Sequence, residues 1–170
     1  MKLETWGSIR MPCIWGQHNG SQLFCPVVIL PPNVQATAQG SHYPGPAPMF
    51  IALIDTGATT TGLATALVTQ LQMQPIGKMQ VHGVGGVQHH NTHLFNVAFP
   101  FLIPPGMSLP AGLPPLPPGQ APMQLQVLHK AIQGCEFNAG NAPFQVLMGM
   151  DVISTGSLVV QGNGTFSFSF

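Results

Sequence analysis

The sequence predicts an all-β class of fold, mainly strands with one or two short helices, and three observations support this. Short apolar runs alternate with glycine- and proline-rich turns along most of the chain. Only residues 62–73 repeat their apolar side chains every three or four positions, as a helix does. Leu, Ile, Val and Phe make up about 28% of the 170 residues, which is enough to bury the core of one domain.

The first half of the predicted domain contains two strands and the main helix. Residues 22–30 form an apolar run typical of a strand. A second run, residues 49–54, stops at Asp55, as a buried strand entering a turn does. The helix is expected over residues 62–73, because Pro75 follows its last apolar residue.

The second half predicts further strands and one helical turn. Residues 79–81 and 87–99 read as two strands joined by a glycine turn, which is typical of a hairpin. Asp151 suits the positive end of a short helix. The remaining strands are expected at residues 124–129, 144–148, 157–161 and 165–170.

Prolines and glycines divide the chain into a domain and its peripheral segments. Nine of the 18 prolines fall within residues 100–122, which favours an extended, Pro-rich surface insertion. A second loop rich in these residues covers residues 31–48. We therefore expect an N-terminal extension over residues 1–21, followed by one domain over residues 22–170 that carries both segments.

The chain carries very little charge. Four Lys and Arg balance four Asp and Glu, so only 5% of residues are charged and the formal net charge is zero. This argues against nucleic-acid binding and against a membrane-surface role, since both need basic residues. A weakly charged surface favours self-association. No segment resembles a signal peptide or a membrane span, so a cytoplasmic location is expected.

Cysteines and histidines do not form a recognisable metal motif. The three cysteines are odd in number and lack a CxxC spacing, which favours free thiols over a zinc site or a disulfide framework. Four histidines, His82, His89, His90 and His93, lie within twelve residues. Their flanks read as strands, with no acid or cysteine nearby in sequence, so we expect hairpin histidines, no metal site and no cofactor.

Asp55 is the strongest candidate for chemistry. It is one of only two aspartates, and it opens Asp55-Thr56-Gly57-Ala58 at the end of a buried strand. Asp-Thr-Gly by itself also fits an ordinary Asx turn with a solvated carboxylate. Two later features strengthen the catalytic interpretation: a Gly-Val-Gly-Gly hairpin at residues 83–86, and an apolar-Gly-Met-Asp segment that ends at Asp151.

In this order, the elements resemble the retropepsin-like aspartic proteases, the family of retroviral-type enzymes. The resemblance covers residues 22–30, 49–99 and 144–170. It implies a retropepsin-like acid protease fold with one lobe per chain, closed as a homodimer. It also implies an aspartic endopeptidase that cleaves extended peptides.

The resemblance assigns the catalytic residues. Hydrolysis by this route needs two carboxylates that share one proton. Asp151 is followed by Val-Ile and is no second catalytic motif, so the dyad would join Asp55 of two subunits. Thr56 would brace the two active-site turns, and Gly57 would let the backbone approach the shared water. Ala58 stands where pepsin-like enzymes usually have Ser, which implies an optimum at mildly acidic to near-neutral pH.

Further substrate-binding positions follow from the same resemblance. Besides Ala58, they are His82, Gly83, Val84, Gly85 and Gly86. These residues match the flap that closes over a peptide bound as an added strand. A plain hairpin turn is the alternative for the glycines taken alone.

The end of the chain and the overall function each leave an alternative. Residues 165–170 alternate Phe with Thr or Ser and are a candidate for an interleaved dimer sheet; the alternative is core cover within one subunit.

In place of an enzyme, the chain could be a catalytically silent dimer that binds peptides or acts as a scaffold. The Pro-rich insertion could also be a ligand for a proline-reading module.

Overall fold

The computed structural model describes residues 13–33, 48–83, 86–102, 123–128 and 130–170 of the chain. Two short helices interrupt a series of strands: α1 (Thr65–Gln70) and α2 (Met150–Ile153). The strands are β1 (Cys13–Gln17), β2 (Leu23–Leu30), β3 (Met49–Ile54), β4 (Gly62–Ala64), β5 (Gly77–Gly83), β6 (Gly86–Leu102), β7 (Met123–Val127), β8 (Ile132–Phe137), β9 (Val146–Met148), β10 (Ser157–Val160) and β11 (Thr165–Ser169). The prediction of a mainly β fold with short helices is confirmed.

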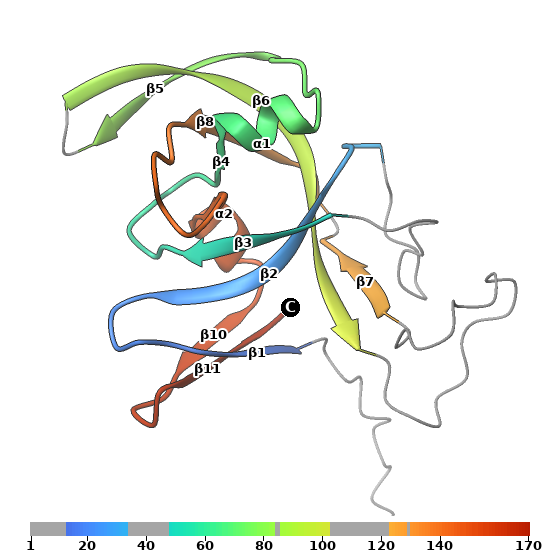
Figure 1. The fold of residues 1–170 in the computed structure, drawn as a ribbon, viewed down its shortest axis with the longest axis vertical. Helices are drawn as coiled ribbons and strands as arrows, with labels where there is room; N and C mark the ends of the chain where they lie inside the picture. The colour runs from blue at the N-terminus through green and yellow to red at the C-terminus, as the bar shows by residue number, and fades with distance from the viewer. Residues whose placement is uncertain (1–12, 34–47, 84–85, 103–122, 129) are drawn as a thin grey trace, which may run out of the picture.

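Two sheets build the molecule (Figure 1). The larger sheet has the order β2-β3-β9-β4-β8-β6-β5, with β7 added to β6. Strand β2 also pairs with β6, at Val28–Leu30 against Asn96–Ala98, so the order closes on itself into a barrel-like ring. The smaller sheet has the order β1-β11-β10.

The hydrophobic core lies between the ring and the smaller sheet. Phe95, Phe99, Phe166 and Phe168 are its largest fully buried side chains. Phe99 meets Phe168 edge-to-face, with ring centroids 5.8 Å apart, so the two sheets are joined through aromatic contacts. Alternation along β11 places both of its phenylalanines on the inner face.

Within the single chain, the C-terminal strand takes the second of the two roles considered for it, core cover within one subunit. Within one chain, β11 pairs with β1 on one side and with β10 on the other. It therefore has no free edge for a strand of another subunit. Its phenylalanines are core cover within one subunit, which was the alternative interpretation.

The helix expected over residues 62–73 is shorter than predicted. Its first part is strand β4, which pairs in parallel with β8 and antiparallel with β9. Because β4 has a paired strand on each side, its backbone groups form hydrogen bonds within the sheet. This pairing overrides the helical periodicity. Helix α1 then runs from Thr65 to Gln70 and ends before Gln72, which has a φ of 52°.

Two strands have no counterpart in the sequence prediction. Strand β1 lies in the stretch expected as an extension, and β8 contains Gly134 and Glu136, which weaken its strand signal. A Cβ on Gly134 would lie 2.5 Å from the Thr61 carbonyl oxygen, so glycine permits this close packing. Strand β6 continues through Pro100 to Leu102, into the predicted insertion. The rest of the insertion, 103–122, lies outside the described residues.

Neither helix in the described part of the chain has the length and apolarity needed to cross a bilayer.

Replacing Phe168 by Ala tests the aromatic contact between the sheets. We expect a loss of about 3–5 kcal/mol in the free energy of unfolding, because a fully buried ring leaves a cavity. Urea unfolding measures it. The half-buried Phe170, whose ring stacks on Phe168, gives a matched Phe170→Ala control with a smaller loss. Equal losses at the two positions would contradict the assignment.

Candidate active site

Asp55 begins the turn that follows β3. Its backbone N–H donates to the Met148 carbonyl at 3.0 Å, and its side chain is half-buried. The carboxylate oxygen Oδ1 accepts a hydrogen bond from the Gly57 N–H at 2.9 Å. Among the described residues, the other oxygen, Oδ2, has no hydrogen-bond partner. The turn therefore orients the carboxylate through one oxygen and leaves the second available to a bound molecule.

The turn is held in place because its two flanking strands, β3 and β4, both pair with a third strand, β9. Strand β3 enters it and β4 leaves it, while β9 lies between them in the order β3-β9-β4. Strand β9 runs parallel to β3 and antiparallel to β4. The C-terminal segment thus passes through the base of the turn, so segments about 90 residues apart in sequence build one site.

Asp151 fastens the far end of the turn. Its Oδ1 accepts from the Thr61 hydroxyl at 2.6 Å, and its Oδ2 accepts from the Thr61 N–H at 3.0 Å. The same hydroxyl accepts from the Gly149 N–H at 3.1 Å. Thr61 is fully buried, so these bonds satisfy polar groups that have no access to water. Both oxygens of Asp151 serve this contact, which supports the structural role expected for it.

Gly149 allows the two segments to touch. A Cβ at this position would lie 2.6 Å from the Thr60 carbonyl carbon, so any side chain would push the turn away. The Met150 N–H donates to the Ala58 carbonyl at 2.8 Å, one residue further along. Together these contacts hold the turn along its length, from Asp55 to Thr61.

The predicted catalytic residues lie together in this turn. Thr56 and Gly57 are exposed, and Ala58 is half-buried with its N–H donating to the Asp55 carbonyl at 3.2 Å. Thr61 and Gly149 were not singled out from the sequence. The apolar-Gly-x-Asp pattern in the sequence contains Gly149 and Asp151. No sequence signal indicates that Thr61 forms hydrogen bonds with them.

The predicted flap positions belong to the β5–β6 hairpin. His82 pairs with Val87, and Gly83 pairs with Gly86 at the end of the ladder. Val84 and Gly85, predicted at the tip, lie outside the described residues. Figure 1 shows the hairpin and the turn after β3 reaching the same side of the molecule, at the left of the view. No interaction joins the described hairpin residues to Asp55.

The histidines do not gather into a metal centre within the described ranges. His82 and His89 are exposed on the hairpin, whereas His93 is only 1% exposed and differs from the partly exposed hairpin residue expected. Its Nδ1 lies 3.2 Å from the Gln74 carbonyl, which only accepts, so Nδ1–H is the donor. Its Nε2 lies 3.5 Å from the Glu136 carboxylate. His93 therefore joins the segment entering the hairpin to β8.

Glu136 is stabilised in its charged form. Burial by itself raises the pKa of this carboxyl, but hydrogen bonds from Thr65 and Asn91 oppose that effect. The His93 ring adds a further hydrogen bond and a favourable charge interaction. The net result is a pKa below the ordinary value of 4.5. Glu136 of β8 is thus joined to Asn91 and His93 of β6, near the base of the hairpin.

Cysteine chemistry plays no part in the turn. The described chain has three free cysteines, and burial raises the pKa of Cys25 to about 12. Burial also raises the pKa of Cys13 and Cys135. At neutral pH these groups are thiols and weak nucleophiles.

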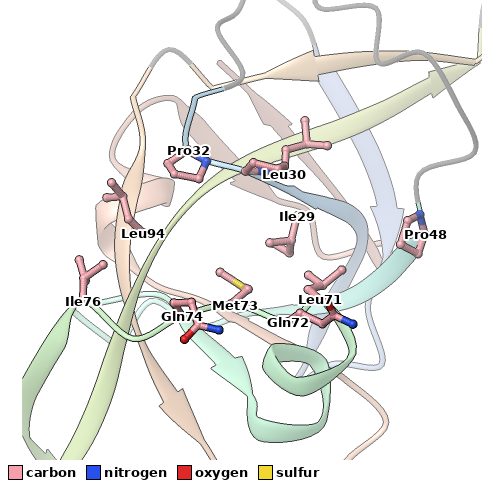
Figure 2. Close-up of a pocket in the computed structure, with 11 residues that line it drawn as sticks. Ile29, Leu30, Pro32, Pro48, Leu71, Gln72, Met73, Gln74, Ile76 and Leu94 are labelled. Atoms are coloured by element: carbon pink, nitrogen blue, oxygen red, sulfur yellow. The ribbon is translucent and has the colours of Figure 1, made fainter.

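A separate apolar pocket of about 530 Å³ lies away from Asp55 (Figure 2). Its lining includes apolar residues of β2, β6 and the segment after α1: Ile29, Leu30, Leu71, Met73, Ile76 and Leu94. In the β2–β3 ladder, Leu23 pairs with Ile54 and Val28 with Met49. The pocket lies at the latter end, roughly 17 Å along the strands from the Asp55 turn.

The comparisons with known proteins support the fold. No protein-family model matches the chain, and no curated protein matches it in sequence. A solved structure, a retropepsin-like aspartic protease from Rickettsia conorii, aligns with a TM-score of 0.52. The alignment covers 99% of this chain and 98% of that one, at 11% sequence identity. The chain has the retropepsin-like protease fold, as the sequence motifs predict; at this identity the likeness concerns the fold alone.

Replacing Thr61 by Val tests the fastening of the turn. Valine keeps the shape but removes the hydroxyl, so the buried Gly149 N–H and one Asp151 oxygen lose a partner. We expect the free energy of unfolding to fall by about 1–3 kcal/mol. Thr61→Ser, which keeps the hydroxyl, is the matched control. Chemical denaturation of both variants gives the answer, and similar losses in the two would show that the hydroxyl does not matter.

Replacing Glu136 by Gln tests the polar group at the base of the hairpin. Because folding lowers the pKa of Glu136, its carboxylate contributes stability above its ordinary pKa, and this is lost as pH falls through the folded value. Glu136→Gln should therefore be less stable than wild type at pH 7, with the difference shrinking on acidification. Thermal unfolding from pH 7 to pH 3 measures this. A difference that grows at low pH would contradict the assignment.

Proposed function

We propose that the protein is a homodimeric aspartic endopeptidase in which Asp55 of each subunit activates one shared water. The observation that carries the proposal is the state of the Asp55 carboxylate. One oxygen is oriented by the Gly57 N–H and the other is open, on a turn held by the C-terminal segment. This carboxylate lies in a chain with the retropepsin-like protease fold.

One chain supplies one aspartate whose carboxylate is open to a bound molecule. Asp151, the only other aspartate, has both oxygens engaged by Thr61. Two-carboxylate hydrolysis therefore calls for a second copy of Asp55 across a two-fold axis. Thr56 and Gly57 are exposed in the single chain, which leaves this end of the turn open to another subunit.

The chemistry proceeds without a cofactor. Two carboxylates a few ångströms apart cannot both ionise, so the pair holds one proton between them. The ionised member takes a proton from water, which attacks the scissile carbonyl carbon. The protonated member donates to the carbonyl oxygen, and the tetrahedral intermediate then breaks its C–N bond as the amine is protonated.

The β5–β6 hairpin provides the cover. In this proposal His82, Gly83 and the glycine tip close over an extended peptide, which is bound as an added strand next to Ala58. Val87 is 51% exposed at the start of β6 and gives the hairpin an apolar contact for such a peptide. The low charge of the chain favours apolar substrate side chains.

Mixing active and inactive subunits tests the shared dyad. Asp55→Asn keeps an oxygen for the Gly57 N–H and should fold normally, but it should abolish peptide cleavage. When wild type and Asp55→Asn are refolded together in equal amounts, one dimer in four carries two aspartates. If the subunits pair at random, we therefore expect about a quarter of the activity of wild type at the same total protein concentration.

The same experiment separates the alternatives. Activity near one half would mean that each chain acts alone, and cleavage by pure Asp55→Asn would mean a contaminating protease. A wild-type dimer that binds peptides without cleaving them from pH 4 to pH 8 would favour the catalytically silent module. The assay uses a peptide library read by mass spectrometry, with pepstatin as an inhibitor control.

A further inference from the structure

The β5–β6 hairpin leaves the larger sheet at Thr92. Strand β6 pairs with β8 from Thr92 to Phe95, whereas its residues 86–91 pair only with β5 among the described strands. Thr92 lies opposite Gly77, the first residue of β5, and its carbonyl accepts from the Ile76 N–H at 2.8 Å. We call this point, where both strands of the hairpin leave the sheet, the hinge. Figure 1 shows the hairpin projecting from it at the top of the view.

The hinge contains a polar group without a partner. Thr92 is fully buried, and its hydroxyl has no hydrogen-bond partner among the described residues. A Cβ on Gly77 would lie 3.4 Å from this hydroxyl oxygen, so the two strands pack closely here. An unsatisfied buried hydroxyl costs free energy, and a movement of the hairpin that admits water would satisfy it. The closed hinge therefore depends on contacts from other side chains.

His93 supplies two such contacts. Its Nδ1 donates to the Gln74 carbonyl at 3.2 Å, in the segment that leads into β5. Its Nε2 lies 3.5 Å from the Glu136 carboxylate of β8, which also accepts from the Asn91 side chain at 3.1 Å. Glu136 thus contacts the residue of β6 on each side of Thr92. The hinge is held from β8 and from the segment before β5 at once.

The contact between His93 and Glu136 needs a proton on Nε2. The Gln74 carbonyl only accepts, so Nδ1 carries a proton. An ionised carboxylate also only accepts, and a neutral ring with its proton on Nδ1 offers Glu136 a lone pair. Both contacts are therefore satisfied together when the ring carries two protons, as an imidazolium–carboxylate ion pair. Because His93 is only 1% exposed, water does not replace either partner.

The other groups around the ion pair are neutral or exposed. On β8, Cys135 is a thiol at neutral pH, because burial raises its pKa. On β5, Lys78 is exposed and forms no ion pair within the described ranges. On α1, the Thr65 hydroxyl contacts Glu136 and stays neutral. The state of the ion pair is therefore governed by His93 and Glu136 themselves.

Strand β8 connects this ion pair to the turn after β3. The Cys135 N–H donates to the Thr61 carbonyl at 3.1 Å, and Glu136 lies opposite Leu63 of β4. Thr61 is the residue that fastens the far end of the turn. One side of the ion pair is thus joined to the turn, whereas the other side, His93, belongs to the strand that forms the hairpin.

We propose that doubly protonated His93 is a positioning residue that holds the hairpin over the turn after β3, and that loss of its proton at higher pH releases the hinge. The neutral ring turns a lone pair toward the carboxylate, so the hairpin loses its contact with β8 as pH rises. The ion pair is also lost at low pH, when Glu136, whose pKa is lowered from 4.5, takes up a proton. The hinge is therefore tightest between these two limits. The use of the hairpin as a cover for a peptide rests on the proposed function; the hinge itself does not.

Hydrogen exchange of the Ile76 N–H measures the hinge, because this amide bonds to the Thr92 carbonyl across it. After correction for the intrinsic effect of pH, we expect its exchange to become about tenfold faster between pH 5.5 and pH 8.5. The Leu128 N–H, which bonds to the Val97 carbonyl away from the hinge, should show no such change. Nitrogen-15 NMR at pH 5.5 should show a proton on both ring nitrogens of His93.

Substitutions separate the charge from the shape. In Glu136→Gln the amide N–H can donate to the neutral ring, so exchange at Ile76 should no longer become faster as pH rises. In His93→Gln no group titrates, so exchange should be equally fast at both pH values. His89→Gln removes an exposed histidine of the same hairpin and is the matched control, which should behave as wild type. Circular dichroism confirms the fold, and wild type and Glu136→Gln suffice if His93→Gln does not fold.

Three results would overturn the positioning role. They are exchange at Ile76 that does not change with pH in wild type, a pH dependence that Glu136→Gln retains in full, and a singly protonated His93 ring at pH 5.5. A purely structural role for the pair predicts that Glu136→Gln speeds exchange without removing its pH dependence.

Peptide cleavage is measured separately. If the hairpin covers the substrate, the KM of wild type should rise between pH 5.5 and pH 8.5 more than that of Glu136→Gln, with a smaller change in kcat. If the exchange pattern is found and no peptide is cleaved, the hinge contact stands and the proposed function fails. If Asp55-dependent cleavage is found and exchange at Ile76 ignores pH, the function stands and the role of His93 fails.

Discussion

The contact between Thr61 and Asp151 is the constraint on which the candidate site depends. It joins a turn in the first half of the chain to a helix near its C-terminal end, 90 positions further along the sequence. Without it, Asp55 would belong to a surface turn of ordinary mobility. With it, the turn is held at both ends, and the Asp55 carboxylate has a fixed orientation in the single chain. Such pre-organisation is what electrostatic and general acid–base catalysis requires.

Local sequence patterns predict much of the fold. The strands that they do not predict depend on pairing with distant parts of the chain. Apolar runs bounded by glycine and proline locate β2, β3 and β6, because burial and turn chemistry act within a few residues. The periodicity of residues 62–64 continues that of α1 and predicts a helix, yet both strands that pair with β4 come from distant parts of the chain. Strand β8 is not predicted for the same reason. Gly134 fits there because it packs against the Thr61 carbonyl oxygen, and Glu136 because it contacts Asn91 and His93. These partners are distant in sequence.

The candidate site shows a similar division. The Asp-Thr-Gly-Ala turn is recognisable because the family resemblance rests on those residues in that order, and they lie together after β3. The position of Asp151 at a helix start predicts a structural role for it. Its partner could not be found this way, since a threonine six residues after Asp55 looks like any other. The burial of His93 is likewise set by Gln74 and Glu136, which sequence proximity does not relate.

The position of β1 has a practical consequence for truncated forms of the protein. A boundary drawn at residue 22, where the recognisable motifs begin, would remove the strand that covers one side of β11. The phenylalanine-bearing strand would then expose a row of backbone donors and acceptors that the intact chain satisfies internally. Variants truncated at residue 22 should consequently aggregate or exchange strands between molecules. An expression plasmid for crystallography should therefore retain the codons for Cys13–Gln17.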